Sequence, residues 1–213
     1  MDGCGCEGFD STFDRRRAEA DRNNYRRSGP NDTTRMLLDL IRRYGVAGSS
    51  ILDIGGGIGV IDHELLREGA GHAVLVDASS ASLRVARDEA RRSNSLDRIG
   101  FVEGDFVREA AGIDSADAVT LHRVVCCYRD AEALVGLSAA RARRVYGLVL
   151  PRDRWFIRLG LRLINFKQRV TRQAFRAYAH PNASIDRIVA ANGLKPRYEA
   201  RTLVWRVVVY DRD

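Results

Sequence analysis

Hydrophobic and polar residues follow two alternating patterns along most of this chain. Short apolar runs bounded by glycine or an acid are typical of buried strands, and apolar residues three or four positions apart are typical of helices. We expect strands at residues 50–54, 72–77, 98–103, 117–121, 144–150, 194–200 and 202–210. We expect helices at 9–27, 33–44, 60–69, 80–90, 130–142, 152–179 and 183–192. Strands and helices that alternate in this way indicate an α/β fold with a parallel sheet.

One main domain with two appended segments is the predicted organisation. Residues 1–30 carry a charged helical stretch with few apolar anchors, which indicates an N-terminal helical arm or lid. Residues 31–213 form the main domain, and a cap is inserted at about 152–180. The cap mixes aromatic and aliphatic residues with arginine, so we expect a basic amphipathic helix. It either covers a substrate pocket or makes a peripheral membrane contact through residues 152–170.

The composition is that of a globular protein. Of the 213 residues, 45% are hydrophobic and 30% are charged, which suits one domain with a full core and excludes a disordered chain. No apolar run reaches the length of about 18 residues that a membrane span needs. The first residues do not read as a secretion signal, so we expect a cytoplasmic protein. The net charge of +7 does not choose between nucleic acid, anionic lipid and an acidic small molecule.

Four cysteines come as two pairs, Cys4/Cys6 and Cys126/Cys127. Neither pair has zinc-finger spacing, and a cytosolic setting argues against structural disulfides. Free thiols and no bound metal are the simpler interpretation. The alternative is that the two pairs meet as a thiolate site for a soft metal.

The segment from Ile51 to Gly59 carries the most specific signal in the chain. A buried strand containing Asp53 runs into a glycine cluster, which allows a tight turn and the close approach of a ligand to the backbone. A dinucleotide-binding loop needs the pattern G-x-G-x-x-G, but Val60 occupies the position of its third glycine. The negative charge of Asp53 favours a cationic nucleotide-like ligand instead.

Acids also follow the next two strands. Asp77 lies 22 residues after Gly55, close to the spacing of about 20 at which a carboxylate accepts hydrogen bonds from ribose hydroxyls. Asp105 and Phe106 follow the third strand. Three acids at the carboxyl ends of three successive strands are expected at the edge of the sheet where ligands bind.

These residues together resemble the class I S-adenosylmethionine (SAM) dependent methyltransferases. The first motif of that family, acid-x-G-x-G-x-G, is met by Asp53, Gly55, Gly57 and Gly59, and the resemblance covers about residues 30–210. It implies a Rossmann-like, seven-stranded, mostly parallel sheet with helices on both faces and an antiparallel C-terminal hairpin. It implies SAM as the cofactor. It also implies that further cofactor contacts come from Asp77, Ala78, Asp105, Phe106 and His122.

Methyl transfer to a small molecule, with an oxygen acceptor favoured, is the function that the resemblance implies. An oxygen or nitrogen acceptor must lose a proton, so a base beside it helps. His122, at the end of the fourth strand, is the first candidate because an imidazole titrates near neutral pH. His180, from the cap, is the second, and Tyr25 and Tyr128 are candidates to orient a substrate oxygen.

The layout is also similar to that of the magnesium-protoporphyrin O-methyltransferases. The shared features are an early Phe13-Asp14-Arg15-Arg16-Arg17 element, a fourth-strand segment that ends in Tyr128, and a basic cap between the fifth and sixth strands. Where that family usually has His-Tyr-Pro, this chain has Cys127-Tyr128-Arg129.

Three other functions are weighed against this one. We expect no nucleic-acid substrate, because the segment from His122 to Tyr128 lacks the Asn/Asp-Pro-Pro-Tyr/Phe element of base-amino methyltransferases, and no aromatic residues interleave the arginines. A protein of this fold can bind SAM without methyl transfer, or use SAM in another reaction such as cyclisation. A NAD-dependent oxidoreductase is disfavoured by the glycine spacing and by Asp53.

Overall fold

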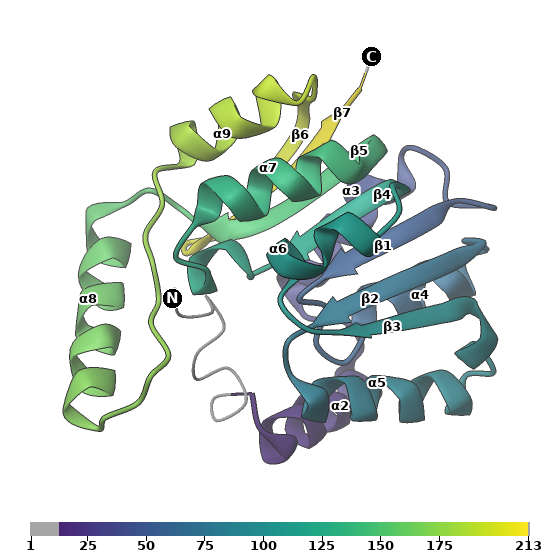
Figure 1. The fold of residues 1–213 in the computed structure, drawn as a ribbon, viewed down its shortest axis with the longest axis horizontal. Helices are drawn as coiled ribbons and strands as arrows, with labels where there is room; N and C mark the ends of the chain where they lie inside the picture. The colour runs from purple at the N-terminus through teal and green to yellow at the C-terminus, as the bar shows by residue number, and fades with distance from the viewer. Residues whose placement is uncertain (1–12, 213) are drawn as a thin grey trace.

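The structure is a computed structural model that describes residues 13–212, and its centre is a single twisted sheet (Figure 1). The strands are β1 (Ser50–Ile54), β2 (His72–Asp77), β3 (Ile99–Glu103), β4 (Ala116–His122), β5 (Ala142–Pro151), β6 (Lys195–Arg201) and β7 (Trp205–Asp211). They lie in the order β3-β2-β1-β4-β5-β7-β6. β1 to β5 are parallel, whereas β7 is antiparallel to both β5 and β6. The predicted seven-stranded sheet with an antiparallel C-terminal hairpin is confirmed.

Helices cover both faces of the sheet, as the sequence predicts (Figure 1). One face carries α3 (Asp32–Arg42), α4 (Val60–Arg67) and α5 (Ser80–Arg92), and the other carries α6 (Phe106–Glu109), α7 (Ala131–Arg141) and α9 (Asn182–Ala191). The arm helix α2 (Arg15–Ser28) lies beside α5, and α8 (Trp155–Val170) stands at the edge of the molecule. Short 3-10 turns are η1 (Leu96–Arg98), η2 (Ala110–Gly112) and η3 (Val125–Cys127). Within residues 13–212, no helix combines the length and apolar character needed to cross a bilayer.

The central strands form where the apolar runs are because they pack between two helical layers. All five residues of β1 are buried, and β4 and β5 are buried over most of their length. Parallel strands buried on both faces read as continuous apolar runs, which is the pattern that predicts them here. The ends of β1, β2 and β4 lie side by side, with Asp53 opposite Thr120 and Ile54 opposite Val76. The loops that carry Asp77, Asp105 and the glycines therefore converge.

The cap differs from its prediction. The expected helix over 152–179 ends at Val170, because Arg172 adopts a left-handed conformation (φ 55°) and Thr171 turns its hydroxyl back to the Lys167 carbonyl. The chain then returns in an extended path. The Asn165 side chain holds that path by donating to the Ala177 carbonyl and accepting from the Ala177 amide, at 2.7 and 2.8 Å.

The predicted arm helix over 9–27 is observed as α2, which starts at Arg15. Asp14 caps it by accepting a hydrogen bond from the Arg17 amide, which satisfies one of the unpaired donors of the first turn. The predicted residues 9–12 lie outside the described part of the chain.

Candidate functional site

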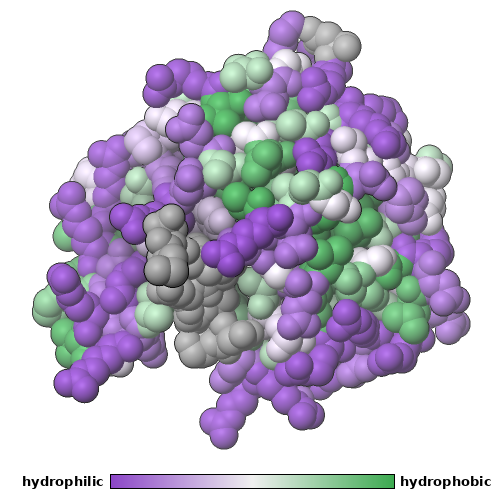
Figure 2. Space-filling view, in the orientation of Figure 1, coloured by the Kyte–Doolittle hydropathy of each residue, from purple (hydrophilic) through white to green (hydrophobic). Residues whose placement is uncertain are grey.

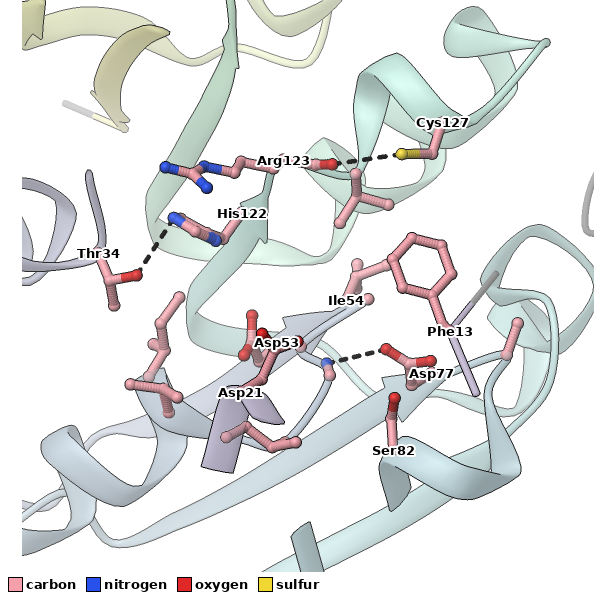
Figure 3. Close-up of a pocket in the computed structure, with 18 of the residues that line it drawn as sticks. Phe13, Asp21, Thr34, Asp53, Ile54, Asp77, Ser82, His122, Arg123 and Cys127 are labelled. Carbon is pink, nitrogen blue, oxygen red and sulfur yellow. Dashed lines mark hydrogen bonds between the residues drawn. The ribbon is translucent and has the colours of Figure 1, made fainter. Parts of the chain in front are cut away.

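A cavity of about 780 Å³ lies at the carboxyl ends of β1, β2 and β4 (Figure 3). Its floor is the glycine loop with the strand-end acids, and its walls come from the arm and the cap. The lining includes Phe13, Arg17, Tyr25, Asp53, Gly55, Gly57, Asp77, Ala78, Asp105, Phe106, His122, Arg123, Cys126, Cys127, Tyr128, Ile164, Phe175, Ala177 and Trp205. A volume of a few hundred Å³ is typical of pockets that bury a cofactor-sized ligand.

The glycine loop is built so that its backbone faces this cavity. Gly57 has φ of 61°, and a Cβ there would meet nothing within 4 Å. By contrast, a Cβ on Gly55 would lie 2.5 Å from a Val124 methyl group, and a Cβ on Gly56 would lie 2.3 Å from an Asp53 carboxylate oxygen. Side chains at positions 55 and 56 would therefore clash with Val124 and Asp53. A side chain at position 57 would project into the space left for a ligand.

Asp77 joins the end of β2 to the glycine loop. One of its oxygens accepts a hydrogen bond from the Gly57 amide at 2.8 Å (Figure 3). The other accepts from the Ser79 amide at 2.7 Å. The carboxylate is thus fixed on the cavity wall at the strand end, which is where a ribose-binding acid is expected.

Asp53 is an acid with almost no access to water, and its relative exposure is 0%. Thr120 donates to one of its oxygens at 2.6 Å, while the other has no hydrogen-bond partner within residues 13–212. Burial raises the pKa of Asp53 to about 7, although the Thr120 hydrogen bond works against the rise. Burial also raises the pKa of Asp62, behind the glycine loop, well above its usual value. A cationic ligand beside Asp53 would favour the ionised form, because opposite charges stabilise each other most where water is excluded.

Asp105 caps α6, and it lines the cavity together with Phe106; both are predicted to contact the cofactor. Tyr128 reaches the same carboxylate with its hydroxyl. The prediction that Tyr128 orients a substrate oxygen is therefore not supported by its contacts. Its buried ring and its hydroxyl hold Asp105 instead.

His122 lies on the cavity wall at the end of β4, as expected, but its surroundings are not those of a base. Its Nε2 is 2.9 Å from the Thr33 hydroxyl and 3.2 Å from the Thr34 hydroxyl. Burial, together with the positive charge of Arg123, lowers the pKa of His122 to about 3. These surroundings disfavour the expected titration near neutral pH, since a desolvated imidazole beside a guanidinium resists protonation.

Arg123 is a cavity residue that the sequence patterns did not indicate. Its backbone is left-handed, with φ of 62°, and this turns the side chain back over Trp205, whose ring centre lies 4.5 Å from the guanidinium carbon. One guanidinium nitrogen donates to the Thr33 hydroxyl at 2.9 Å, and Nε has no hydrogen-bond partner among residues 13–212. No carboxylate in that part of the chain forms an ion pair with it. Burial lowers the pKa of Arg123, so the site holds an incompletely compensated positive charge.

The other two proposed catalytic residues are engaged in packing the arm and the cap. Tyr25 lines the cavity, but its hydroxyl donates to Glu64 at 2.7 Å, and burial with this hydrogen bond raises its pKa to about 12. His180 is absent from the described cavity lining. Its Nε2 lies 2.9 Å from the Tyr128 carbonyl and must donate to it, since a carbonyl only accepts. Both side chains therefore attach flanking segments to the main domain.

Arm and cap meet over the cavity. The rings of Phe13 and Phe175 pack edge to face, with centroids 5.9 Å apart and an interplanar angle of 85°. The Ser79 hydroxyl donates to the Phe13 carbonyl at 2.7 Å, which ties the arm to the start of α5. The arm and the cap, which are far apart in the sequence, therefore line neighbouring parts of the same cavity.

The central cysteine pair also reaches the cavity. The sulfur atoms of Cys126 and Cys127 are 3.9 Å apart, and each thiol lies 3.5 Å from the Arg123 carbonyl. Residues 13–212 contain no group of three or more side chains able to hold a metal ion. Cys4 and Cys6 lie outside the described residues, so the alternative of a shared thiolate site stays a hypothesis.

Comparison with protein families and curated relatives gives a consistent result. Residues 51–145 match the family described as a methyltransferase domain. Ribosomal protein L11 methyltransferase of Lachnospira eligens is 28% identical over 113 residues, which is 52% of this chain and 35% of that protein. The protein of the same name from Pelotomaculum thermopropionicum is 33% identical over 85 residues, 40% of this chain and 28% of that protein. The chain therefore spans about a third of the length of these relatives.

Solved structures share the fold over most of this chain. Magnesium protoporphyrin IX methyltransferase of Synechocystis, with bound S-adenosylhomocysteine, superposes with a TM-score of 0.68 at 22% identity and covers 85% of this chain and 82% of that one. An O-methyltransferase family protein of Burkholderia thailandensis gives a TM-score of 0.72 at 19% identity, over 98% of this chain and 64% of that one. At these identities the likeness is one of fold.

Proposed function

Since residues 51–145 belong to the methyltransferase domain family, in the fold of the class I SAM-dependent methyltransferases and with SAM as cofactor, we propose that this protein methylates a small molecule on an oxygen. We propose further that the oxygen belongs to a carboxylate. The observation that carries the second step is Arg123, a cavity-lining guanidinium without a carboxylate partner among residues 13–212.

The residues on the floor fit the cofactor. The Gly57 backbone leaves room for SAM to approach the loop. Asp77 would accept hydrogen bonds from the ribose hydroxyls, and Asp105 and Phe106 would contact the adenine. Bound SAM supplies an electrophilic methyl group on a positively charged sulfur. The unpaired oxygen of Asp53 gives that side of the cavity a negative charge when it is ionised.

Arg123 suits a carboxylate acceptor. A guanidinium offers five N–H donors in a planar fork that matches the two oxygens of a carboxylate, and such charge-assisted bonds are the strong ones. Trp205 and Thr33 fix its orientation from two sides. An anionic acceptor held here would compensate a charge that the protein leaves largely unpaired within residues 13–212.

The low pKa of His122 supports the same acceptor class. A phenol or alcohol must lose a proton as it is methylated, whereas a carboxylate near neutral pH has already lost it. His122, with a pKa of about 3, is a weak proton acceptor. We therefore propose it as a neutral positioning residue that holds the start of α3 through Thr33 and Thr34.

A small acceptor is favoured over a protein by the apolar walls of the cavity. Phe13 and Phe175 pack against each other in these walls, and Ile164 and Trp205 add further apolar surface. An acceptor with an apolar body and one carboxylate would match this lining. The curated relatives named for a ribosomal protein cover only part of this chain, so they do not argue for a protein acceptor here.

The test is methyl transfer from isotopically labelled SAM to a panel of aromatic and aliphatic carboxylic acids, with matching phenols beside them. Methyl esters release methanol in mild base and phenyl ethers do not, so base lability identifies the acceptor oxygen. R123Q should raise the KM for a carboxylate by about 10- to 100-fold, the loss expected for a charge-assisted bond. R129Q removes an exposed arginine six residues after Arg123 and should leave the KM unchanged.

Three results would contradict the proposal. Base-stable products would show that the acceptor is a phenol and not a carboxylate, although methyl transfer would still be the reaction. SAM binding without turnover on any acceptor would favour the non-methylating alternative, and NAD binding in place of SAM would remove the whole assignment.

A further inference from the structure

Helix α8 presents three parallel rows of side chains with different surroundings. Residues four and seven positions apart on a helix lie on one face. One such row, Ile157, Leu161 and Gln168, is turned toward the protein and is buried or half-buried. The next row, Arg158, Arg162 and Arg169, is exposed. The third row, Trp155, Leu159 and Phe166, is also exposed, although all three residues are large and apolar.

The apolar row is part of a wider exposed stripe. Trp155 is 75% exposed, Phe166 and Val170 are each 67% exposed, and Leu163 is 61% exposed. Figure 2 shows hydrophobic atoms at the left edge of the molecule, over α8, between hydrophilic neighbours. Isolated exposed apolar residues are common on proteins, but a continuous stripe along one helix marks an interaction surface.

A second segment extends this stripe. Leu203, in the β6–β7 turn, is 73% exposed, and Val204 beside it is 38% exposed. The Arg152 amide donates to the Val204 carbonyl at 2.8 Å, so the turn lies next to the start of α8. Two parts of the chain that are far apart in sequence therefore expose apolar residues beside one another.

Charge distinguishes the possible partners of this stripe. The helix carries four basic residues, Arg158, Arg162, Lys167 and Arg169, and no acid. The arginine row borders the apolar stripe on one side, and Lys167 borders it on the other. Arg158 forms an ion pair with Asp153, which leaves Arg162, Lys167 and Arg169 without ion pairs within residues 13–212.

We propose that α8, with the β6–β7 turn, docks this protein on a membrane surface that contains anionic lipid. An apolar stripe with Trp and Phe, bordered by Arg and Lys, is the arrangement of helices that lie in the membrane interface. The rings enter the boundary between headgroups and acyl chains while the long basic side chains reach the lipid phosphates. A second copy of the chain would meet the same positive charge on both sides, which disfavours self-association through α8. This proposal does not depend on the methyl acceptor.

The test is co-sedimentation of the protein with phosphatidylcholine vesicles and with vesicles that also contain phosphatidylglycerol. Binding should be strong to the mixed vesicles, weak to phosphatidylcholine alone, and reduced by salt. R162Q/R169Q should weaken binding to the mixed vesicles about 30-fold, since each basic residue near an anionic surface contributes about a factor of five. W155S/F166S should weaken it by roughly 100-fold.

The matched control is R84Q/R187Q, which removes the same charge from exposed positions on α5 and α9. It should bind the mixed vesicles as the parent protein does. A blue shift of tryptophan emission on binding, absent in W155F, would place Trp155 in the interface.

Several outcomes would overturn the proposal. The absence of binding to the mixed vesicles would do so. An equal loss of vesicle binding in the R84Q/R187Q control would also do so, because it would show that net charge alone attracts the protein to the vesicles. Concentration-dependent dimerisation that W155S/F166S abolishes, without vesicle binding, would show that a second copy covers the stripe.

Discussion

The Tyr128 hydroxyl lies 3.0 and 2.9 Å from the two carboxylate oxygens of Asp105, although the two residues are 23 positions apart in the sequence. One of those oxygens also accepts from the Val107 amide at 3.0 Å. Tyr128 follows η3 after β4, and Asp105 follows β3, so the bond joins two loops on the cavity wall. Because the phenol is buried, this orientation is fixed before a ligand arrives.

Replacing Tyr128 by phenylalanine should weaken SAM binding by about 3- to 10-fold, since it removes one hydrogen bond to Asp105 and keeps the ring. Calorimetric titration with SAM measures this directly. Y146F is the control, because the Tyr146 hydroxyl is buried against Ser138 and does not line the cavity. Equal effects of the two variants would show that the loss comes from general destabilisation.

Asp77→Ala should weaken SAM binding by about 1–3 kcal/mol, because the ribose hydroxyls and the Gly57 amide would lose an acceptor. Asp130→Ala also removes an acid that accepts from a backbone amide, at the start of α7 and away from the cavity. It should lower the free energy of unfolding but leave SAM affinity unchanged. Unchanged affinity in D77A would remove Asp77 from the cofactor site.

SAM affinity should rise as the pH increases through about 7. Asp53 has a pKa of about 7 in the free protein, so it is protonated below that value, and the cationic ligand favours the ionised carboxylate. Binding near pH 7 should therefore release a proton, which titrations in buffers of different ionisation enthalpy detect. In D53N the affinity should be nearly independent of pH.

The same raised pKa makes a prediction about folding. The folded protein holds the Asp53 proton more tightly than the unfolded chain, whose aspartates titrate near 3.8. The contribution of Asp53 to the free energy of unfolding is therefore full below the pKa that it has in the unfolded chain. This contribution is lost as the pH rises through about 7. D53N should show a smaller fall in melting temperature over this range. An identical fall in both proteins would exclude Asp53 as the source.

At saturating SAM, the pH profile of kcat/KM for a carboxylate acceptor should lack an inflection from an imidazole near neutrality. His122 stays neutral there because burial and Arg123 lower its pKa to about 3. H122N should reduce turnover by a similar factor at every pH, through lost positioning, with SAM affinity nearly intact. An inflection near neutral pH that disappears in H122N would restore His122 as the base.

The cofactor floor could be predicted from the sequence because its signals are local. The loop after β1 needs glycine wherever its backbone is left-handed or approaches a neighbour closely. Gly55, Gly57 and Gly59 are left-handed, with φ of 64°, 61° and 75°. Asp77 and Asp105 follow strands whose apolar runs are unmistakable. Since parallel strands place their carboxyl ends together, local signals were enough to assemble this part of the site.

The acceptor side could not be predicted in the same way, because it depends on contacts between distant residues. The pKa of His122 is set by its burial behind α3, where Thr33 and Thr34 lie 89 and 88 positions earlier in the chain. Arg123 reaches Trp205 only because its backbone is left-handed, which no neighbouring glycine signals. The cap helix ends at Val170 because Arg172 is also left-handed, again without a glycine to signal it. Local patterns identify residue types, but they do not show which residues distant in the sequence come into contact.

The edge-to-face contact between Phe13 and Phe175 has a kinetic consequence. The two rings belong to the arm and to the cap, and both line the cavity proposed to hold cofactor and acceptor. We propose that the two rings separate when SAM enters and separate again when S-adenosylhomocysteine leaves. Separation of the two rings would then limit turnover, and a smaller residue at either position should exchange ligands faster while admitting more water to the methyl donor.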